Sequence, residues 1–307
     1  MSTVIGTAVS APMTIGDPAW AQTLTASKIA AVLGLSRWDS PFSIWHKMAG
    51  NASWNADENL DEKRRGHYLE PAVRQWYREH HPNYQVDKNV STFVHKDRPW
   101  QGASPDGIVL RRNVERTPIG LFEGKTDNLY WQWGEEGTDQ IPAGYRAQCM
   151  WQMDVFGLPF VDVAVLDSNL TFREYRVEYD AAEAADMRAR ALDFLDSLHT
   201  GRQPGLDAHG ETYRVVRELH PDIDNVTVDI DPGLAVRYVN AVSALEIAQE
   251  DLAEKTTLLA DAIGTGRAGI CNDIVLATRI SKAGSTPFLR RSNGLTSKFT
   301  LIEKEAS

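Results

Sequence analysis

The change of hydrophobic period along the chain constrains the fold most. Over residues 66–80 the apolar side chains recur with helical spacing, and the same holds over residues 142–156. Between these segments the period changes to short runs of strand-forming residues at 84–94, 100–110 and 119–126, which turn residues separate. Helices interleaved with strands in this way predict a mixed α/β fold, with helices flanking a central sheet.

The C-terminal part continues this pattern and then changes character. Two further strands are expected at 160–167 and 171–179, and Asp180 is placed to cap a helix that Gly201 ends. A long helix follows Asp231, with short strands after it. Its heptad seam runs through Tyr238, Val242, Leu245, Gln249, Leu252, Thr256, Leu259 and Ile263. This seam serves either assembly or packing on its own domain.

These elements divide the chain into four predicted parts. We expect a flexible N-terminal arm over residues 1–24, which hold small and apolar residues without Lys or Arg. The α/β core covers 25–201, and a linker over 202–230 contains several Pro, Gly and Asp residues. The long helix and a β extension make up 231–307.

Composition excludes several classes of protein. Only two of the 307 residues are cysteines, which argues against a disulfide framework, a cysteine-ligated iron–sulfur cluster and an oxidising compartment. The chain shows no secretory signal and no membrane-length apolar run, so we expect a cytoplasmic protein. The net charge of -10 argues against a protein that coats DNA, but it allows an enzyme with a local positive channel.

The segment Phe122-Glu123-Gly124-Lys125 is the first candidate for chemistry. Side chains two residues apart on a strand point to the same face, so Glu123 and Lys125 are expected to converge. A carboxylate binds a hard cation, and an ammonium beside it orients water or stabilises developing charge, as phosphodiester hydrolysis requires. By itself, a Glu-x-Lys pattern is most often an ordinary surface pair.

A second carboxylate lies one predicted strand earlier, in Ser104-Pro105-Asp106-Gly107. These residue types also form plain β-turns. If the two runs form a hairpin through residues 111–118, Asp106 lies beside Glu123, and a divalent cation would relieve the repulsion between them.

Two helices offer supporting side chains. Glu70 lies one position off the apolar stripe of its helix, where it is either a solvated glutamate or an inward carboxylate near the metal. Tyr145 and Gln148 are three residues apart and share a helix face. They are either a boundary pair or a site for the scissile phosphate and the attacking water.

Five motifs occur in a characteristic order. They are Thr25-Ala26-Ser27, Gly66 to Pro71, Ser104-Pro105-Asp106-Gly107, Glu123-Gly124-Lys125-Thr126 and Tyr145-Arg146-Ala147-Gln148. Each motif is weak alone, but five in this order resemble the YqaJ viral recombinases, which belong with lambda exonuclease in the PD-(D/E)xK nuclease superfamily. The resemblance covers roughly residues 20–200. It implies that residues 25–201 form a restriction-endonuclease-like nuclease core.

The resemblance also implies an activity and a set of roles. It indicates a Mg²⁺-dependent 5′→3′ exonuclease on linear double-stranded DNA in phage-type homologous recombination, with Mn²⁺ able to replace Mg²⁺. It assigns the metal ligands to Asp106, Glu123 and the carbonyl of Gly124, and further catalytic roles to Lys125, Glu70 and Gln148.

The DNA contacts that the resemblance implies include one departure from the family pattern. Ser27 matches a serine near the 5′ end of the DNA. Relatives often carry an arginine shortly before this serine, which holds the 5′ phosphate, whereas here no Lys or Arg precedes Lys28. We therefore expect Lys28 or Arg37 to take that role, with Tyr145 as a further DNA contact.

Partners follow from the same resemblance. It implies a ring-shaped homo-oligomer such as a trimer, a single-strand annealing protein as partner, and a phage or prophage origin in a bacterial host. Two alternatives stay open: an endonuclease on the same core, and a catalytically inactive relative that binds DNA ends as a scaffold. An iron–sulfur nuclease of the RecB-like branch would need four cysteines, and the chain has two.

Overall fold

The computed structural model describes residues 6–9, 13, 17–54, 60–112, 116–128, 132–282 and 284–296. The chain forms two compact units, residues 1–222 and residues 223–307, and each is described by itself. Within the described residues, no helix is both long enough and apolar enough to cross a membrane.

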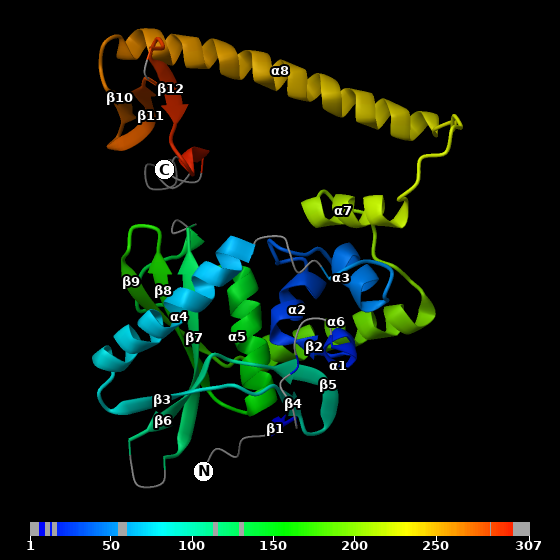
Figure 1. Cartoon of the computed structure of the whole chain (residues 1–307), viewed down its shortest axis with the longest axis vertical. Coiled ribbons are helices and arrows are strands. Elements are labelled where there is room, and N and C mark those ends of the chain that lie inside the picture. Colours follow the sequence, from blue (N-terminus) through cyan, green and yellow to red (C-terminus); the bar gives the residue numbers. More distant parts are fainter. Residues whose placement is uncertain are drawn as a thin grey trace. The chain divides into compact units, whose positions relative to one another are not determined.

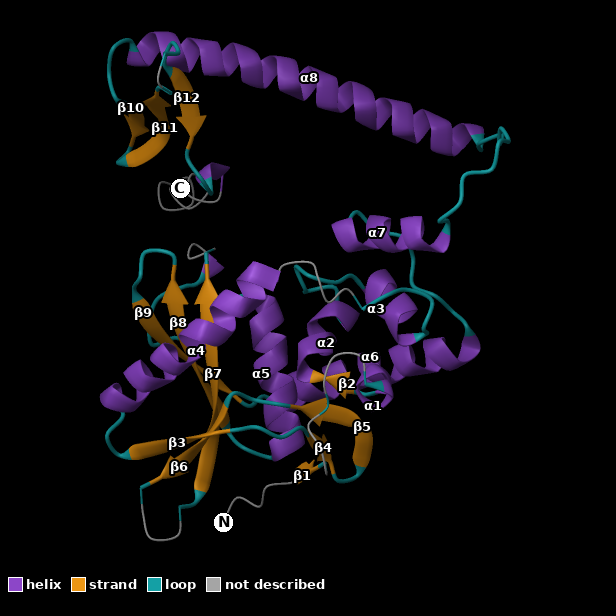
Figure 2. Ribbon diagram, in the orientation of Figure 1, coloured by secondary structure: helices purple, strands orange, loops and turns teal. Residues whose placement is uncertain are grey.

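A mixed five-stranded sheet organises the first unit (Figures 1 and 2). In spatial order its strands are β3 (Tyr84–Lys88), β6 (Gly107–Arg111), β7 (Pro118–Asp127), β8 (Phe160–Asp167) and β9 (Phe172–Glu178). Only β7 and β8 run parallel; the other neighbours are antiparallel. The long connection that includes α5 makes the parallel pair possible, because parallel strands cannot be joined by a tight turn.

A second, four-stranded sheet contains β1 (Gly6–Ala8), β4 (Phe93–His95), β5 (Arg98–Ala103) and β2 (Leu24–Thr25) in that order. The predicted run at 100–110 is therefore two strands in different sheets, because the turn at Pro105 and Asp106 divides it. The described parts of the predicted flexible arm also form regular structure, since β1 pairs with β4 and a short helix follows.

Helices cover both faces of the large sheet. In the first unit they are α1 (Pro18–Gln22), α2 (Ala26–Val32), α3 (Pro41–Met48), α4 (Leu60–His80), α5 (Ala143–Phe156), α6 (Ala181–Thr200) and α7 (Gly210–Leu219). Along β8, Val161, Val163 and Val165 join the core cluster of α5 and α6, whereas Ala164 and Leu166 join the cluster of α4. This alternation confirms the predicted mixed α/β fold with a flanked central sheet.

The predicted cap at Asp180 and the predicted end at Gly201 are both confirmed in α6. Ser40 likewise caps α3 through a side-chain acceptor, and Gly157 ends α5 in the left-handed conformation that Gly201 also adopts. Helix α4 differs, because it begins at Leu60 and contains Pro71 in its interior. Proline has no N–H for the usual bond to a carbonyl four residues earlier, so it is best tolerated in the first turn of a helix.

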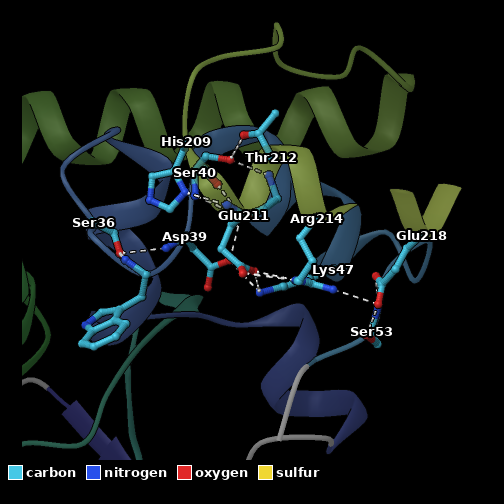
Figure 3. A network of polar contacts seen from close by, with 12 residues as sticks. Ser36, Asp39, Ser40, Lys47, Ser53, His209, Glu211, Thr212, Arg214 and Glu218 are labelled. Carbon is cyan, nitrogen blue, oxygen red and sulfur yellow. Dashed lines mark hydrogen bonds and ion pairs between the residues drawn. The ribbon is translucent and has the colours of Figure 1, made fainter. Parts of the chain in front are cut away.

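Helix α7 lies within the segment predicted as a linker, and polar contacts join it to α3 (Figure 3). The buried Lys47 ammonium contacts Asp39 at 2.7 Å and Glu211 at 3.0 Å. Ser40 and Thr212 share a hydrogen bond of 2.6 Å. Lys47 and Ser40 lie 164 and 172 residues before their partners in α7, so local composition could not indicate that this segment packs on the core.

The second unit contains α8 (Pro232–Ile263) and an antiparallel sheet of β10 (Ala268–Cys271), β11 (Ile274–Ile280) and β12 (Phe288–Arg291). The helix start predicted at Asp231 is confirmed, because its side chain accepts the N–H of Leu234. With 32 residues, α8 is about 48 Å long. The role predicted for its heptad seam stays a prediction.

Candidate active site

On its β6 side, strand β7 loses its pairing partner where the candidate residues lie. Strand β6 pairs with β7 only as far as Gly107 opposite Phe122, while β8 continues beside β7 to Asp127. Beyond Phe122, the Gly124 N–H therefore points to the side that β6 has left, where it donates to Asp106 Oδ2 at 2.9 Å. The hairpin predicted between the two motifs is confirmed, and it brings Asp106 beside the Glu123-Gly124-Lys125 segment.

Glu123 and Lys125 share the face of β7 that α5 covers. The Lys125 ammonium contacts Glu123 Oε1 at 2.6 Å and Gln148 Oε1 at 3.2 Å. Gln148 in turn donates through Nε2 to Glu123 Oε1 at 2.6 Å. The predicted convergence of the three side chains is therefore present. Because Glu123 is almost completely buried, its charge depends on these partners.

Glu70 reaches the same place from α4, on the other face of the sheet. A cavity of about 240 Å³ is lined by Gly66, His67, Glu70, Val73, Asp106, Glu123, Gly124, Lys125 and Thr126. A Cβ atom at Gly124 would lie in ordinary contact with Asp106 and Glu70, at 3.7 Å from each, which places Gly124 beside both carboxylic side chains. Glu70 also forms an ion pair with Arg74, one helical turn later. The structure thus brings three carboxylates and one ammonium to a single cavity.

Burial and the neighbouring charges both shift the pKa values of Asp106 and Lys125. Burial, followed by the Glu123 carboxylate, raises the pKa of Asp106 from 3.8 to about 8. Burial alone would lower the pKa of Lys125, but Glu123 and Asp106 outweigh it and hold that pKa above its ordinary value. Lys125 therefore keeps its charge, whereas Asp106 holds a proton up to about pH 8.

A larger cavity of about 1030 Å³ adjoins the first and shares Gly66, His67, Gly124, Lys125 and Thr126 with it. Aromatic side chains contribute to its wall, among them Trp20, Trp38, Trp54 and Tyr145. Tyr145 lines the larger cavity next to Lys125, which lines both cavities. The Lys125 ammonium lies 5.0 Å from the Tyr145 ring, and the Tyr145 hydroxyl accepts from Arg37 at 3.1 Å.

The predicted DNA contacts divide into two groups. Ser27 and Arg37 line the larger cavity, and each makes a local contact: Ser27 with the Thr25 hydroxyl at 2.9 Å, and Arg37 with Asp127 at 3.1 Å. Lys28 also borders this cavity, but its side chain is buried and donates to the carbonyls of Trp20, Ala21 and Thr23. Its three N–H donors are thus engaged by backbone acceptors, so this geometry argues against the predicted phosphate contact.

We expect Lys28→Met to reduce stability and leave the chemistry unchanged. The substitution keeps an apolar stem between Trp20 and Trp54 but removes the donors to three carbonyls near the end of α1. Unpaired buried carbonyls cost about 1–3 kcal/mol. Urea unfolding should show this loss, with nuclease activity per folded molecule within about twofold of wild type. An unchanged stability together with lost activity would instead restore Lys28 to the DNA site.

The structure also adds contacts that the sequence analysis did not identify. Gln152, one helical turn after Gln148, donates through Nε2 to Glu123 Oε2 at 2.8 Å. The spacing of four residues was a usable signal, because it places both glutamines on one face of α5. Among the described residues, no group of three or more His, Cys, Asp or Glu residues stands out as a metal site. The predicted ligand set differs in kind, since it combines two carboxylates with a backbone carbonyl.

Comparison with protein families identifies the domain that carries this site. The family model described as the YqaJ-like viral recombinase domain matches residues 18–159. This part of the chain is similar to the YqaJ-like viral recombinase domain. This match includes every predicted catalytic, metal and DNA-binding residue, from Ser27 to Gln148, and confirms the family resemblance. The match ends before α6, α7 and the second unit.

The chain is similar to the crystal structure of an alkaline exonuclease, LHK-Exo, from Laribacter hongkongensis, with 22% identity and a TM-score of 0.44 over 65% of this chain and 94% of that chain. It is also similar to LHK-Exo in complex with dAMP, with 21% identity and a TM-score of 0.46 over 66% and 96% of the two chains. No curated protein matches the chain.

Proposed function

We propose that the chain is a Mg²⁺-dependent exonuclease that degrades linear double-stranded DNA in the 5′→3′ direction during recombination. The observation that carries this proposal is the small cavity in which Asp106, Glu123, Glu70 and Lys125 meet at the uncovered edge of β7. The recombinase domain and the larger adjoining cavity, with its aromatic and cationic side chains, support it.

The residues of the small cavity fit a divalent cation. Asp106 keeps its proton to an unusually high pH because it is buried beside other carboxylates, and a divalent cation would replace that proton. Asp106, Glu123 and the Gly124 carbonyl are the proposed ligands, and these hard oxygen donors suit Mg²⁺ or Mn²⁺. Bound there, the cation would supply Lewis acidity for the scissile phosphate.

The chain's own side chains carry the remaining work. The Lys125 ammonium, held by Glu123 and Gln148, is placed to orient the attacking water and to stabilise negative charge as it develops on the phosphate. Gln148 lies beside it with an amide that can also hold that water. Glu70, which Arg74 positions on α4, adds a carboxylate at the opposite wall of the cavity.

The larger cavity is the proposed path of the DNA strand. Its aromatic rings suit stacking with bases, because every base has a π-face. Arg37 is the proposed contact of the terminal phosphate, with Ser27 and Tyr145 beside it. Lys28 is not proposed as a phosphate contact, because its ammonium already donates to backbone carbonyls. We also propose, from the family resemblance, a ring-shaped homo-oligomer, a single-strand annealing protein as partner, and a phage-encoded protein acting in the bacterial cytoplasm.

Binding of Mg²⁺ should depend on pH in a defined direction. Below about pH 8 the cation must displace the proton of Asp106, so we expect half-saturation to need about tenfold less Mg²⁺ at pH 7 than at pH 6, with a plateau above about pH 8. Because this carboxyl binds its proton more tightly in the folded state, the metal-free protein should lose stability as pH rises from about 4 to about 8. Calorimetric Mg²⁺ titrations and urea unfolding at several pH values measure both effects. A pH-independent Mg²⁺ affinity would contradict this assignment.

Digestion of matched linear and covalently closed circular duplexes tests the function. With Mg²⁺ we expect linear duplex to be degraded and closed circles to survive, and EDTA should stop the reaction. Release of label from the 5′ end before the 3′ end would support the proposed direction. Rapid cutting of closed circles would favour an endonuclease, and DNA-end binding without any cleavage would favour an inactive scaffold.

A further inference from the structure

Gln152 is buried and lines neither of the two cavities. It lies on the inner face of α5 with no exposed surface, one turn beyond Gln148. Its amide Nε2 donates to Glu123 Oε2 at 2.8 Å, so its contact with the cavity runs through Glu123. Any effect of Gln152 on the reaction must therefore act through the carboxylate of Glu123.

The two glutamines hold opposite oxygens of Glu123. Gln148 donates to Oε1 at 2.6 Å, on the side where the Lys125 ammonium also binds at 2.6 Å. Gln152 donates to Oε2, on the side away from Lys125. Together these donors fix the rotation of the carboxylate about its terminal bond, a torsion that is otherwise broad.

The amide of Gln152 is held from one end only. Among the described residues, its buried carbonyl Oε1 has no hydrogen-bond partner, whereas its Nε2 is paired with Glu123. A buried unpaired acceptor costs free energy, so a residue selected for packing alone would be apolar here. The hydrogen bond to Glu123 therefore explains why an amide, and not an apolar side chain, occupies this position.

We propose that Gln152 is a positioning residue for the metal-binding carboxylate: it orients Glu123 so that Oε1 faces Lys125 and the cavity. This inference rests on the proposed function, because it assumes that Glu123 binds the cation. Partners that orient a metal ligand commonly change metal affinity or activity by about 10–100-fold when they are replaced. Gln152 should therefore govern the Mg²⁺ requirement without touching the substrate.

The test compares Gln152→Met with Gln101→Met in the full-length chain. Gln101 is a matched control, because it is equally buried and donates to a carboxylate, Asp154, at 2.7 Å outside the small cavity. Mg²⁺ binding is measured by calorimetry without DNA, duplex cleavage is measured across Mg²⁺ concentrations, and thermal unfolding is measured in EDTA. We expect Gln152→Met to need about tenfold more Mg²⁺ in both assays. Gln101→Met should stay within about twofold of wild type while its Tm changes.

The outcomes separate this inference from the function on which it rests. Equal Mg²⁺ affinity of Gln152→Met and wild type, measured without DNA, overturns the role of Gln152 even if the enzyme cleaves DNA. Wild-type protein that binds Mg²⁺ but never cleaves duplex overturns the proposed function and leaves the binding comparison valid. If Gln152→Met does not fold, Gln152→Asn serves under the same criterion, because it keeps an amide that is one methylene too short to reach Glu123.

Discussion

Asp106→Asn is expected to reduce duplex cleavage by at least about a thousandfold while the protein stays folded. The asparagine keeps an oxygen that accepts the Gly124 N–H, but it removes the charge that would bind the cation, an interaction worth several kcal/mol in the transition state. Glu123→Gln should have an effect of the same order. Initial rates on linear duplex at saturating Mg²⁺ measure the loss.

Asp106→Asn should reduce activity but should not reduce the stability of the metal-free protein. In the metal-free wild type, the buried carboxylate is destabilising once it ionises, because it lies beside Glu123 and Glu70. The variant should therefore be at least as stable as wild type above pH 8 in EDTA. Asp162→Asn is the matched control: Asp162 is also buried, yet it is held by Tyr77 and Arg176 away from the cavity. That substitution should lower stability and leave cleavage within a few-fold of wild type.

Lys125→Met is expected to lower the cleavage rate by about 100- to 1000-fold, because it removes the positive charge proposed to stabilise the transition state. Mg²⁺ binding without DNA should be retained or strengthened, since the ammonium that contacts Glu123 Oε1 at 2.6 Å no longer competes for that oxygen. Calorimetry and single-turnover cleavage on the same preparation distinguish the two effects. A large loss of Mg²⁺ affinity would mean that Lys125 organises the ligands instead of acting on the phosphate.

Lys125→Arg tests whether any cation suffices at this position. The ammonium lies between Glu123, Gln148 and the Tyr145 ring at the wall of a cavity of about 240 Å³. A planar guanidinium is larger and directs its donors differently, so we expect rescue of no more than about a tenth of the wild-type rate. Recovery of the full rate would show that charge alone matters there.

Local sequence determined the elements that carry the candidate site. The alternation along residues 122–125 was enough to place Glu123 and Lys125 on one face, because side-chain direction on a strand follows from the period of two. Asp106 could be placed beside them once a hairpin was assumed, and β6 and β7 do pair in that way. The start and the end of α6 at Asp180 and Gly201 followed from capping chemistry.

The path of the backbone was beyond the reach of that reasoning. Lys28 was a candidate contact for the terminal phosphate, but the carbonyls of Trp20, Ala21 and Thr23 bind its ammonium. These carbonyls are only five to eight residues away, yet no periodic pattern shows that the turn at the end of α1 directs them at Lys28. The linker prediction did not include α7, whose Glu211 forms an ion pair with Lys47, 164 residues earlier. That partner lies far outside the window in which composition and periodicity act.

The sequence by itself determined which residue types were available for phosphodiester chemistry and on which elements they lie. Only the tertiary structure decided their protonation and their partners. The end of the β6–β7 pairing at Phe122 opens the edge where Asp106 enters, and burial there raises its pKa to about 8. Helix α5 then supplies Gln148 and Gln152 to the two oxygens of Glu123. Burial and hydrogen bonding depend on surfaces that meet only after folding, so no local pattern encodes them.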